Sequence, residues 1–502
     1  DFLSLHSLGE TQNLNNLSRA VFAMARPIDI IFIADSIIII LLIFLFKKRY
    51  RSKTRNIKIF LVYLIIPIAY ISILHFNSDF HDENYNGPVF FKTQFLPSST
   101  MNNLSPIGYH FYDTLLFIQD NMHHVITAKE EIEVKNWLGF KNEDITNVKD
   151  KGLYKGKNLI FIQVESLENF VINQKSEGQT LTPNLNKMLA NSMYFDNFYE
   201  QVNTGNSGDA DLMVNASVLP VRRGSTFFRF PNNSYNTLSD ILKVENYYSS
   251  TLHASDGNIW NISKALKNFG FDQELDYRDF KNTEKFWMGL TDESFFSQIS
   301  TMIDTVKKPF YYYTVTVSSH IPFVLPDNMK NLKLSKEFDS THMGAYFQSV
   351  NYADEQIGKF VDELDKKNVL DNTILVIFGD HTGVHKYYGD EINNLKEYES
   401  WWDDNLKVPF IIYSKGSKGQ LVNTVGGEVD VLPTIANLFG IDKEKYENTS
   451  MGRDLLNTNR NYAILNDGVV VGKETLTSAE INNVNQSFTI ADLIIRTNYF
   501  NK

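Results

Sequence analysis

The chain has 502 residues, of which 43% are hydrophobic, and carries a formal net charge of -11. A chain of this length and apolar content can hold two or three domains and bury a large core, which excludes a disordered or fibrous protein. The negative charge argues against nucleic acid as a partner, because phosphate backbones bind basic surfaces. No cysteine is present, which excludes disulfides, thiolate metal sites and cysteine nucleophiles.

Residues 1–27 lack a basic segment followed by an apolar core, so they do not have the pattern of a signal peptide. The first residue is Asp1 rather than methionine. We therefore expect the chain to begin partway through a longer protein, with residues 1–27 as an extracellular segment.

Two long apolar runs follow, at residues 30–46 and 59–76, and each is about long enough to cross a bilayer. Seven lysine and arginine residues lie between positions 47 and 58, and such a basic loop stays on the cytoplasmic side. Residues 28–76 are therefore predicted to form two transmembrane helices with a cytoplasmic loop. The alternative, a pair of buried core helices, is less favoured because long soluble helices usually keep a polar face.

Residues 77–156 are predicted to connect this region to the main domain. The stretch 77–104 is rich in Asn, Ser, Pro and aromatic residues and has no clear periodicity, whereas 111–138 has helical spacing. We expect an exposed connector followed by juxtamembrane helices.

From residue 157 onward, short apolar runs alternate with helical stretches. Strands are predicted at 158–166, 309–319, 372–380 and 408–414, and helices at 183–192, 351–367 and 430–440. Near-continuous apolar strands are buried on both faces, which predicts an α/β fold with a mostly parallel sheet flanked by helices. This extracellular catalytic domain is predicted to span residues 157–460. Residues 461–502 form a C-terminal segment with one apolar run and no assigned structure.

Polar residues follow three of these strands directly. Ligands of open α/β sheets bind beyond the carboxyl ends of the strands, where Glu165, His320 and the pair Asp380-His381 stand. An adjacent aspartate and histidine can place an oxygen and a nitrogen on one divalent cation. The alternative is a helix-capping carboxylate with a surface histidine.

The segment 203–211, NTGNSGDAD, is dense in residues that favour tight turns and helix starts. A helix N-terminus at Ser207 would favour an anion beside its hydroxyl, although a plain N-cap serine is the alternative. A serine-hydrolase elbow is disfavoured, because Asp209 stands where that motif needs glycine.

Seven motifs in the range 157–445 together resemble the alkaline phosphatase and sulfatase superfamily, and most closely the lipoteichoic acid synthases. They are NLIFIQVESLENFVIN, TPNLNKML, YFDNFYEQVNTGNSGDADLMVNASVLP, LHASDGNIWN, TVTVSSHIPF, LVIFGDHTG and VDVLPTIANLFGID. The resemblance implies a metal site made of Glu165, Ser207, Asp380 and His381. It also implies that Ser207 is the nucleophile, at a position where family members usually have threonine, which supplies the same hydroxyl.

The resemblance further implies that His320 binds the substrate phosphate and that Trp260 lines a glycerol-phosphate pocket. The family has a phosphate-binding arginine two residues after this tryptophan, but the present chain has Ile262. Loss of a bidentate phosphate contact weakens the prediction that the head group is the same. Four polar residues are further candidates for reshaping the pocket, and the first two are predicted to bind substrate: Arg223, Asp256, His253 and His385.

The activity that the resemblance implies is a membrane-bound phosphoglycerol transferase. It would move glycerol phosphate from phosphatidylglycerol to a glycolipid or a growing lipoteichoic acid chain through a phosphoserine-type intermediate. The expected cofactor is Mn²⁺, with Mg²⁺ or Zn²⁺ as alternatives. The expected location is the bacterial cell membrane, with several spans and an extracellular catalytic domain. Alternatives are a metal-dependent phosphodiesterase or sulfatase-type hydrolase, a phosphoethanolamine transferase, and a binding protein without catalysis.

Overall fold

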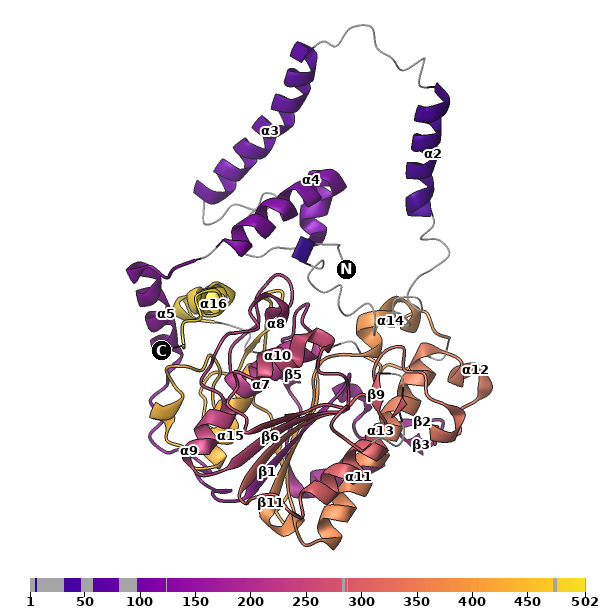
Figure 1. The fold of residues 1–502 in the computed structure, drawn as a ribbon, viewed down its shortest axis with the longest axis vertical. Helices are drawn as coiled ribbons and strands as arrows, with labels where there is room; N and C mark the ends of the chain where they lie inside the picture. Colours follow the sequence, from indigo (N-terminus) through magenta and orange to yellow (C-terminus); the bar gives the residue numbers. More distant parts are fainter. Residues whose placement is uncertain are drawn as a thin grey trace. The chain divides into compact units, whose positions relative to one another are not determined.

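A computed structural model describes most of the chain: residues 5–6, 31–46, 57–80, 97–122, 124–281, 285–286, 288–396, 398–403, 405–472 and 476–501. The described residues divide into two compact units (Figure 1). The first contains helices α2 (Ile31–Phe46), α3 (Ile57–Phe80) and α4 (Pro97–Asn121). The second contains residue 6 and everything described from residue 122 onward.

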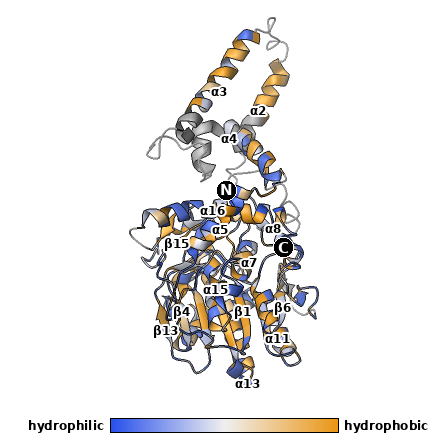
Figure 2. Cartoon of the chain, turned by 90° about the vertical axis from the view of Figure 1, so that its left-hand side faces the viewer, coloured by the Kyte–Doolittle hydropathy of each residue, from blue (hydrophilic) through white to orange (hydrophobic). Residues whose placement is uncertain are grey.

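Helices α2 and α3 coincide with the two apolar runs of the sequence. Their described side chains, 37–46 in α2 and 57–70 and 72–73 in α3, are exposed, and both helices are largely hydrophobic (Figure 2). Helix α4 begins at Pro97, inside the stretch that lacks periodicity in the sequence.

The sequence predicts that these two runs span a membrane. Within the part of the chain that the structure describes, no helix combines the length and the apolar character needed to cross one.

An eight-stranded sheet forms the centre of the second unit. In spatial order its strands are β13 (Gln420–Val422), β4 (Ser192–Phe195), β12 (Phe410–Ser414), β11 (Thr373–Gly379), β1 (Asn158–Val164), β10 (Phe310–Val315), β6 (Tyr248–His253) and β7 (Gln273–Leu275). Strand β12 is antiparallel to both neighbours, and all other pairs are parallel. The predicted mostly parallel sheet is confirmed.

The central strand β1 is buried on both faces. All seven of its residues are buried. Because successive side chains of a strand point to opposite faces, Ile160 and Ile162 pack into one core, whereas Leu159 and Phe161 pack into the other. This explains the uninterrupted apolar run in the sequence, which a sheet with one solvated face would not need.

Helices cover both faces of the sheet (Figure 1). Helices α6 (Pro183–Met188), α11 (Asp292–Met302) and α13 (His342–Lys366) contribute to the first core, and α7 (Ser207–Ala216), α9 (Leu238–Val244) and α15 (Val431–Leu438) contribute to the second. The predicted helices at 183–192, 351–367 and 430–440 correspond to α6, α13 and α15. Helix α13 starts earlier than predicted, where the Thr341 hydroxyl caps it by accepting from the Gly344 N–H.

The C-terminal segment contains a helix that the sequence reading left unassigned. Helix α16 (Ser478–Arg496) begins with a capping box between Thr477 and Glu480. It packs against α5 (Ala128–Lys141), and the indole N–H of Trp137 donates to the Asn483 carbonyl oxygen at 2.8 Å. The end of the chain is therefore part of the second unit.

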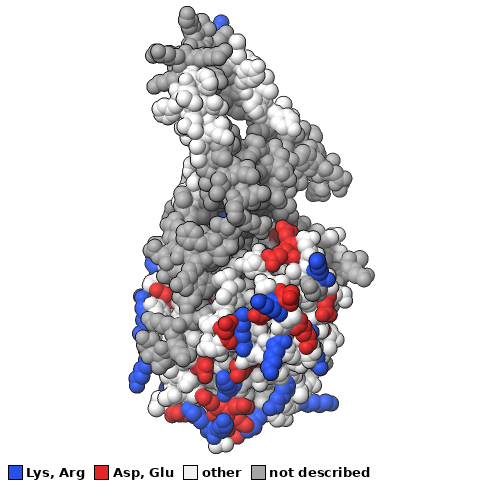
Figure 3. All heavy atoms as spheres, turned by 90° about the vertical axis from the view of Figure 1, so that its right-hand side faces the viewer, with Lys and Arg blue, Asp and Glu red and all other residues white. Residues whose placement is uncertain are grey.

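Shorter elements complete this unit: α8 (Thr226–Arg229), α10 (Ile262–Leu266), α12 (Lys336–Asp339), α14 (Val384–Ile392), β2 (Lys175–Ser176), β3 (Gln179–Thr180), β5 (Phe198–Tyr199), β8 (Lys285–Phe286), β9 (Gly289–Leu290), β14 (Gly426–Gly427), β15 (Ala463–Ile464) and β16 (Val470–Val471). On the face drawn in Figure 3, acidic and basic side chains of the second unit are interspersed.

Candidate active site

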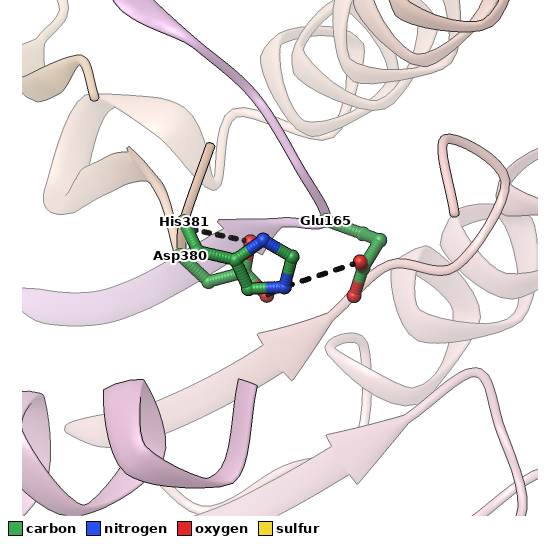
Figure 4. Close-up of side chains that lie close together, drawn as sticks. All are labelled: Glu165, Asp380 and His381. Atoms are coloured by element: carbon green, nitrogen blue, oxygen red, sulfur yellow. Dashed lines mark hydrogen bonds and ion pairs between the residues drawn. The ribbon is translucent and has the colours of Figure 1, made fainter. Parts of the chain in front are cut away.

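Three side chains with metal-binding atoms meet at the carboxyl edge of the sheet. Glu165 follows β1 directly, and Asp380 and His381 follow β11. These two strands pair in parallel with Val164 opposite Gly379, so the residues that come next emerge side by side. One ligand atom from each of the three residues lies within 4.8 Å of the other two, and all three side chains are buried (Figure 4).

The histidine presents a nitrogen lone pair to the two carboxylates. His381 Nε2 lies 3.5 Å from Glu165 Oε1 and 3.7 Å from Asp380 Oδ2. His381 Nδ1 lies 2.8 Å from the Thr382 carbonyl oxygen, which can only accept a hydrogen bond. The hydrogen of the neutral ring is therefore on Nδ1, and Nε2 is available as a metal ligand.

One carboxylate oxygen of Asp380 receives no hydrogen bond from the described residues. Asp380 Oδ1 accepts the backbone N–H groups of Ser166 at 2.8 Å and His381 at 2.9 Å. Asp380 Oδ2 is buried and has no hydrogen-bond partner among the described residues. A buried carboxylate oxygen without a donor is costly, and a divalent cation at this point satisfies it. The donor set of Glu165, Asp380 and His381 therefore fits a divalent cation.

Ser207 is the first residue of α7 and adds a hydroxyl to this cluster. Its hydroxyl donates to Glu165 Oε2 at 3.1 Å and lies 3.5 Å from His381 Nε2. The N-terminal N–H groups and the dipole of α7 favour negative charge at this position. The structure thus brings together the four residues that the resemblance implies for the metal site.

The turn before Ser207 is built around a buried carboxylate. Asp209 Oδ2 accepts the backbone N–H groups of Asn203 and Gly205, each at 3.0 Å. A β-carbon at Gly205 would lie 2.2 Å from Asp209 Oδ1, so only glycine leaves room for this carboxylate. Lys386, on α14, donates from Nζ to Asn206 Oδ1 at 2.6 Å and ties that helix to the turn.

His320 lies in the loop that follows β10. Burial lowers its pKa, while the negative charge of Asp380 acts in the opposite direction. Its Nδ1 lies 2.8 Å from the Ile321 carbonyl oxygen, so the Nδ1 hydrogen is donated to that oxygen. Donation from Nε2 to a phosphate oxygen therefore requires the imidazolium form, which a bound anion favours.

Trp260 lies beside the first residues of α7. Its Cβ is 3.7 Å from the position that a β-carbon on Gly208 would take, and its ring centroid is 6.1 Å from that of Phe228. Ile262, two residues later, is the first residue of α10 and is 4% exposed within a hydrophobic core. The residue that stands where the resemblance expects an arginine thus packs into the core.

Two residues predicted to bind substrate have local structural contacts. Asp256 Oδ1 accepts from the backbone N–H and the side-chain amide of Asn258, at 2.9 and 2.8 Å, and lies 3.9 Å from Arg278 Nη2. The Arg223 carbonyl oxygen accepts a hydrogen bond from Arg229. Substrate binding by Asp256 and Arg223 stays a prediction.

The two histidines named as further candidates differ in their surroundings. His253 is buried at the end of β6, where desolvation lowers its pKa to about 4, so it is neutral. His385 Nδ1 lies 2.6 Å from Glu168 Oε2. Only His385 belongs to the segment that carries the Asp380-His381 pair.

Glu168 is a structural residue of the site that the sequence patterns do not predict. Its Oε1 accepts the backbone N–H groups of Gly383 at 2.9 Å and His385 at 3.3 Å. It thereby holds the loop that begins with the Asp380-His381 pair. The sequence feature that could have identified Glu168 is its position in the segment ESLEN, three residues after Glu165.

Metal affinity is expected to fall on acidification. Burial and then the nearby Asp380 carboxylate raise the pKa of Glu165 to about 7 in the metal-free protein. Below pH 7 a proton occupies this carboxylate and competes with the cation, so we expect the apparent affinity for Mn²⁺ to fall about tenfold per pH unit there. Calorimetric titrations between pH 8 and pH 5 measure this, and a constant affinity would contradict it.

Glu168→Gln is expected to weaken Mn²⁺ binding by about tenfold or more, because it removes the charge that orders the Asp380-His381 loop. The matched control is Glu337→Gln, which changes an exposed glutamate. Calorimetry at fixed pH compares the two variants. Equal Mn²⁺ affinities for both would show that Glu168 does not position the site.

Comparisons with known proteins show the family of the chain. Residues 157–441 match the Sulfatase family model, and residues 1–125 match the Lipoteichoic acid synthase N-terminal domain. The chain is 30% identical over 468 residues to Lipoteichoic acid synthase 1 of Bacillus subtilis, covering 91% of this chain and 71% of that protein. It is also 30% identical over 476 residues to the Lipoteichoic acid synthase of Staphylococcus saprophyticus, covering 92% and 72% respectively.

Solved structures show the same fold. The lipoteichoic acid synthase LtaP from Listeria monocytogenes superposes with a TM-score of 0.64 at 24% identity, over 72% of this chain and 98% of that one. The sulfatase and alkaline phosphatase fold implies a divalent metal, in agreement with the donor set described above. On the family match and the two sequence relatives, the chain belongs to the lipoteichoic acid synthase family and has a sulfatase-type domain.

Proposed function

We propose that the chain is a phosphoglycerol transferase that moves glycerol phosphate from phosphatidylglycerol to a glycolipid or a growing lipoteichoic acid chain. The observation that carries this proposal is the Ser207 hydroxyl at the N-terminus of α7, 3.1 Å from Glu165 in a metal-binding cluster. The names of the relatives supply the substrate class.

In the first half-reaction, the Ser207 hydroxyl loses its proton and its oxygen bonds to the phosphorus of the donor lipid. The bond between phosphorus and the diacylglycerol oxygen breaks, and diacylglycerol leaves with a proton. Glu165, Asp380, His381 and Ser207 would hold a divalent cation, which would lower the pKa of the hydroxyl and offset charge on the phosphoryl oxygens. The N-terminal N–H groups of α7 favour the same negative charge.

In the second half-reaction, a hydroxyl of the acceptor bonds to phosphorus and the Ser207 oxygen leaves and regains a proton. The product carries one more glycerol phosphate unit, and the serine is ready for another donor. His320 in its imidazolium form donates to a phosphate oxygen. Trp260, whose Cβ lies near Gly208, lines the glycerol-phosphate pocket.

Three oxygen ligands with one imidazole favour Mn²⁺ over softer metals, with Mg²⁺ and Zn²⁺ as alternatives. The exposed apolar side chains of α2 and α3, together with the match of residues 1–125, support a location at the bacterial cell membrane. We infer a multi-pass protein whose catalytic domain is extracellular and close to its lipid donor.

A second candidate function is a metal-dependent phosphodiesterase or sulfatase-type hydrolase, which the Sulfatase match over residues 157–441 favours. It would use the same cluster and pass the intermediate to water. Incubation of the full chain with labelled phosphatidylglycerol, with and without glycolipid, separates the two. Transfer predicts label on the glycolipid, whereas release of free glycerol phosphate despite added glycolipid would support hydrolysis.

Ser207→Ala is expected to reduce diacylglycerol release from a fluorescent phosphatidylglycerol analogue by about a thousandfold or more, because it removes the attacking oxygen. Ser207→Thr keeps a hydroxyl and should retain activity. Ser297→Ala, at an exposed position on α11, is the matched control. Undiminished release by Ser207→Ala would exclude Ser207 as the nucleophile.

A further inference from the structure

Helix α4 turns large apolar side chains outward. Phe111, Leu115 and Ile118 are 68%, 49% and 55% exposed, and their spacing of four and then three residues places them on one face of the helix. Single exposed apolar side chains are common on soluble proteins, but three on one helix face form a continuous apolar stripe. The proposed transfer reaction gives this stripe no role.

The opposite face of α4 is buried although it carries two carboxyl groups. Tyr109, Asp113, Leu116 and Asp120 follow one another at helical spacing on this face, and all four are buried. Asp113 Oδ2 accepts the backbone N–H of Leu5 at 2.8 Å. A helix of a water-soluble protein usually turns its apolar residues to the core and its charged residues to water. In α4 both acidic residues lie on the inner face and the apolar stripe lies on the outer face.

Polar residues border the apolar stripe on both sides. His110 and Asn121 on one side and Gln119 on the other are exposed. Helix α4 contains no lysine or arginine. Its outward surface is therefore an uncharged apolar strip between polar margins, which suits a helix that lies in a membrane interface with its apolar side toward the acyl chains. Without cations, its attraction to lipid would come from apolar burial rather than from anionic head groups.

The place of α4 in the chain indicates which surface covers the stripe. Helix α4 belongs to the same compact unit as α2 and α3, whose described side chains are exposed and largely apolar. The match to the Lipoteichoic acid synthase N-terminal domain covers residues 1–125 and so includes α4, whereas the Sulfatase match begins at residue 157. These observations favour a lipid surface.

A second copy of the chain fits the stripe less well than a bilayer does. From Phe111 to Ile118 the stripe extends about 10 Å along the helix. A stable protein interface buries about 800 Å² on each partner, which is more than one short row of three side chains can supply. A bilayer needs no complementary shape, so a narrow apolar strip is enough for it.

We propose that α4 is an interfacial helix that lies on the lipid bilayer, with Phe111, Leu115 and Ile118 at the boundary between head groups and acyl chains. The proposal rests on the membrane location in the proposed function and adds the surface that meets the bilayer outside α2 and α3. The two carboxyl groups on the opposite face suit a helix that lies on the membrane rather than one that crosses it. The chain leading to the catalytic unit would thus stay at the level of the phospholipid head groups.

The test uses the absence of cysteine, because each single-cysteine variant of the full chain then takes one label. Leu115→Cys and Ile118→Cys place a nitrobenzoxadiazole dye on the stripe, and His110→Cys and Gln119→Cys are the matched controls at exposed polar positions. The labelled chains are reconstituted in vesicles of phosphatidylcholine and phosphatidylglycerol with spin-labelled lipid. We expect the two dyes on the stripe to emit at shorter wavelength and to be quenched about twofold more than the controls, and most by lipid labelled near the head group.

Equal emission and equal quenching at all four positions would overturn the proposal. A shift to shorter wavelength at positions 115 and 118 without quenching by lipid would also overturn it, because protein rather than lipid would then cover the stripe. A dye at Ile65→Cys on α3 reports the membrane location separately. Quenching there beside four unquenched dyes on α4 would reject the interfacial helix and leave the proposed location standing. No turnover is measured, so a failure of the proposed transfer reaction does not affect this result.

Discussion

The parallel pairing of β1 with β11 is the constraint on which the site depends. It sets Val164 opposite Gly379, and the next residue of each strand is a carboxylate buried at the same edge. Two buried carboxylates and a histidine lone pair at this separation repel one another unless a cation lies between them. The burial that makes the sheet stable thus also makes the cluster a metal site, and α7 adds the Ser207 hydroxyl to it.

Strand patterning made much of this predictable from the sequence. Uninterrupted apolar runs predict central parallel strands, and the rule that ligands bind at the carboxyl ends of strands selects Glu165 and the Asp380-His381 pair. The antiparallel direction of β12 was not predicted, because burial on both faces gives the same sequence pattern in either direction. Helix α16 was missed although Thr477 and Glu480 form a capping box in the sequence.

Residues that act through contacts between distant segments were the hardest to predict. Glu168 holds the loop after β11, and Lys386 ties α14 to the turn before Ser207. The two residues in each contact are far apart in the sequence, so no local pattern shows that they meet. For Ile262, the sequence shows that isoleucine replaces the arginine of the family. It does not show that this side chain packs into a hydrophobic core.

The central claim is that one divalent cation lies among these four side chains. Anomalous X-ray scattering from a crystal of the full chain grown with Mn²⁺ tests it most directly. The account predicts a single strong peak within bonding distance of Glu165, Ser207, Asp380 and His381. A protein that is free of metal at this edge of the sheet, or that holds the ion elsewhere, would contradict it.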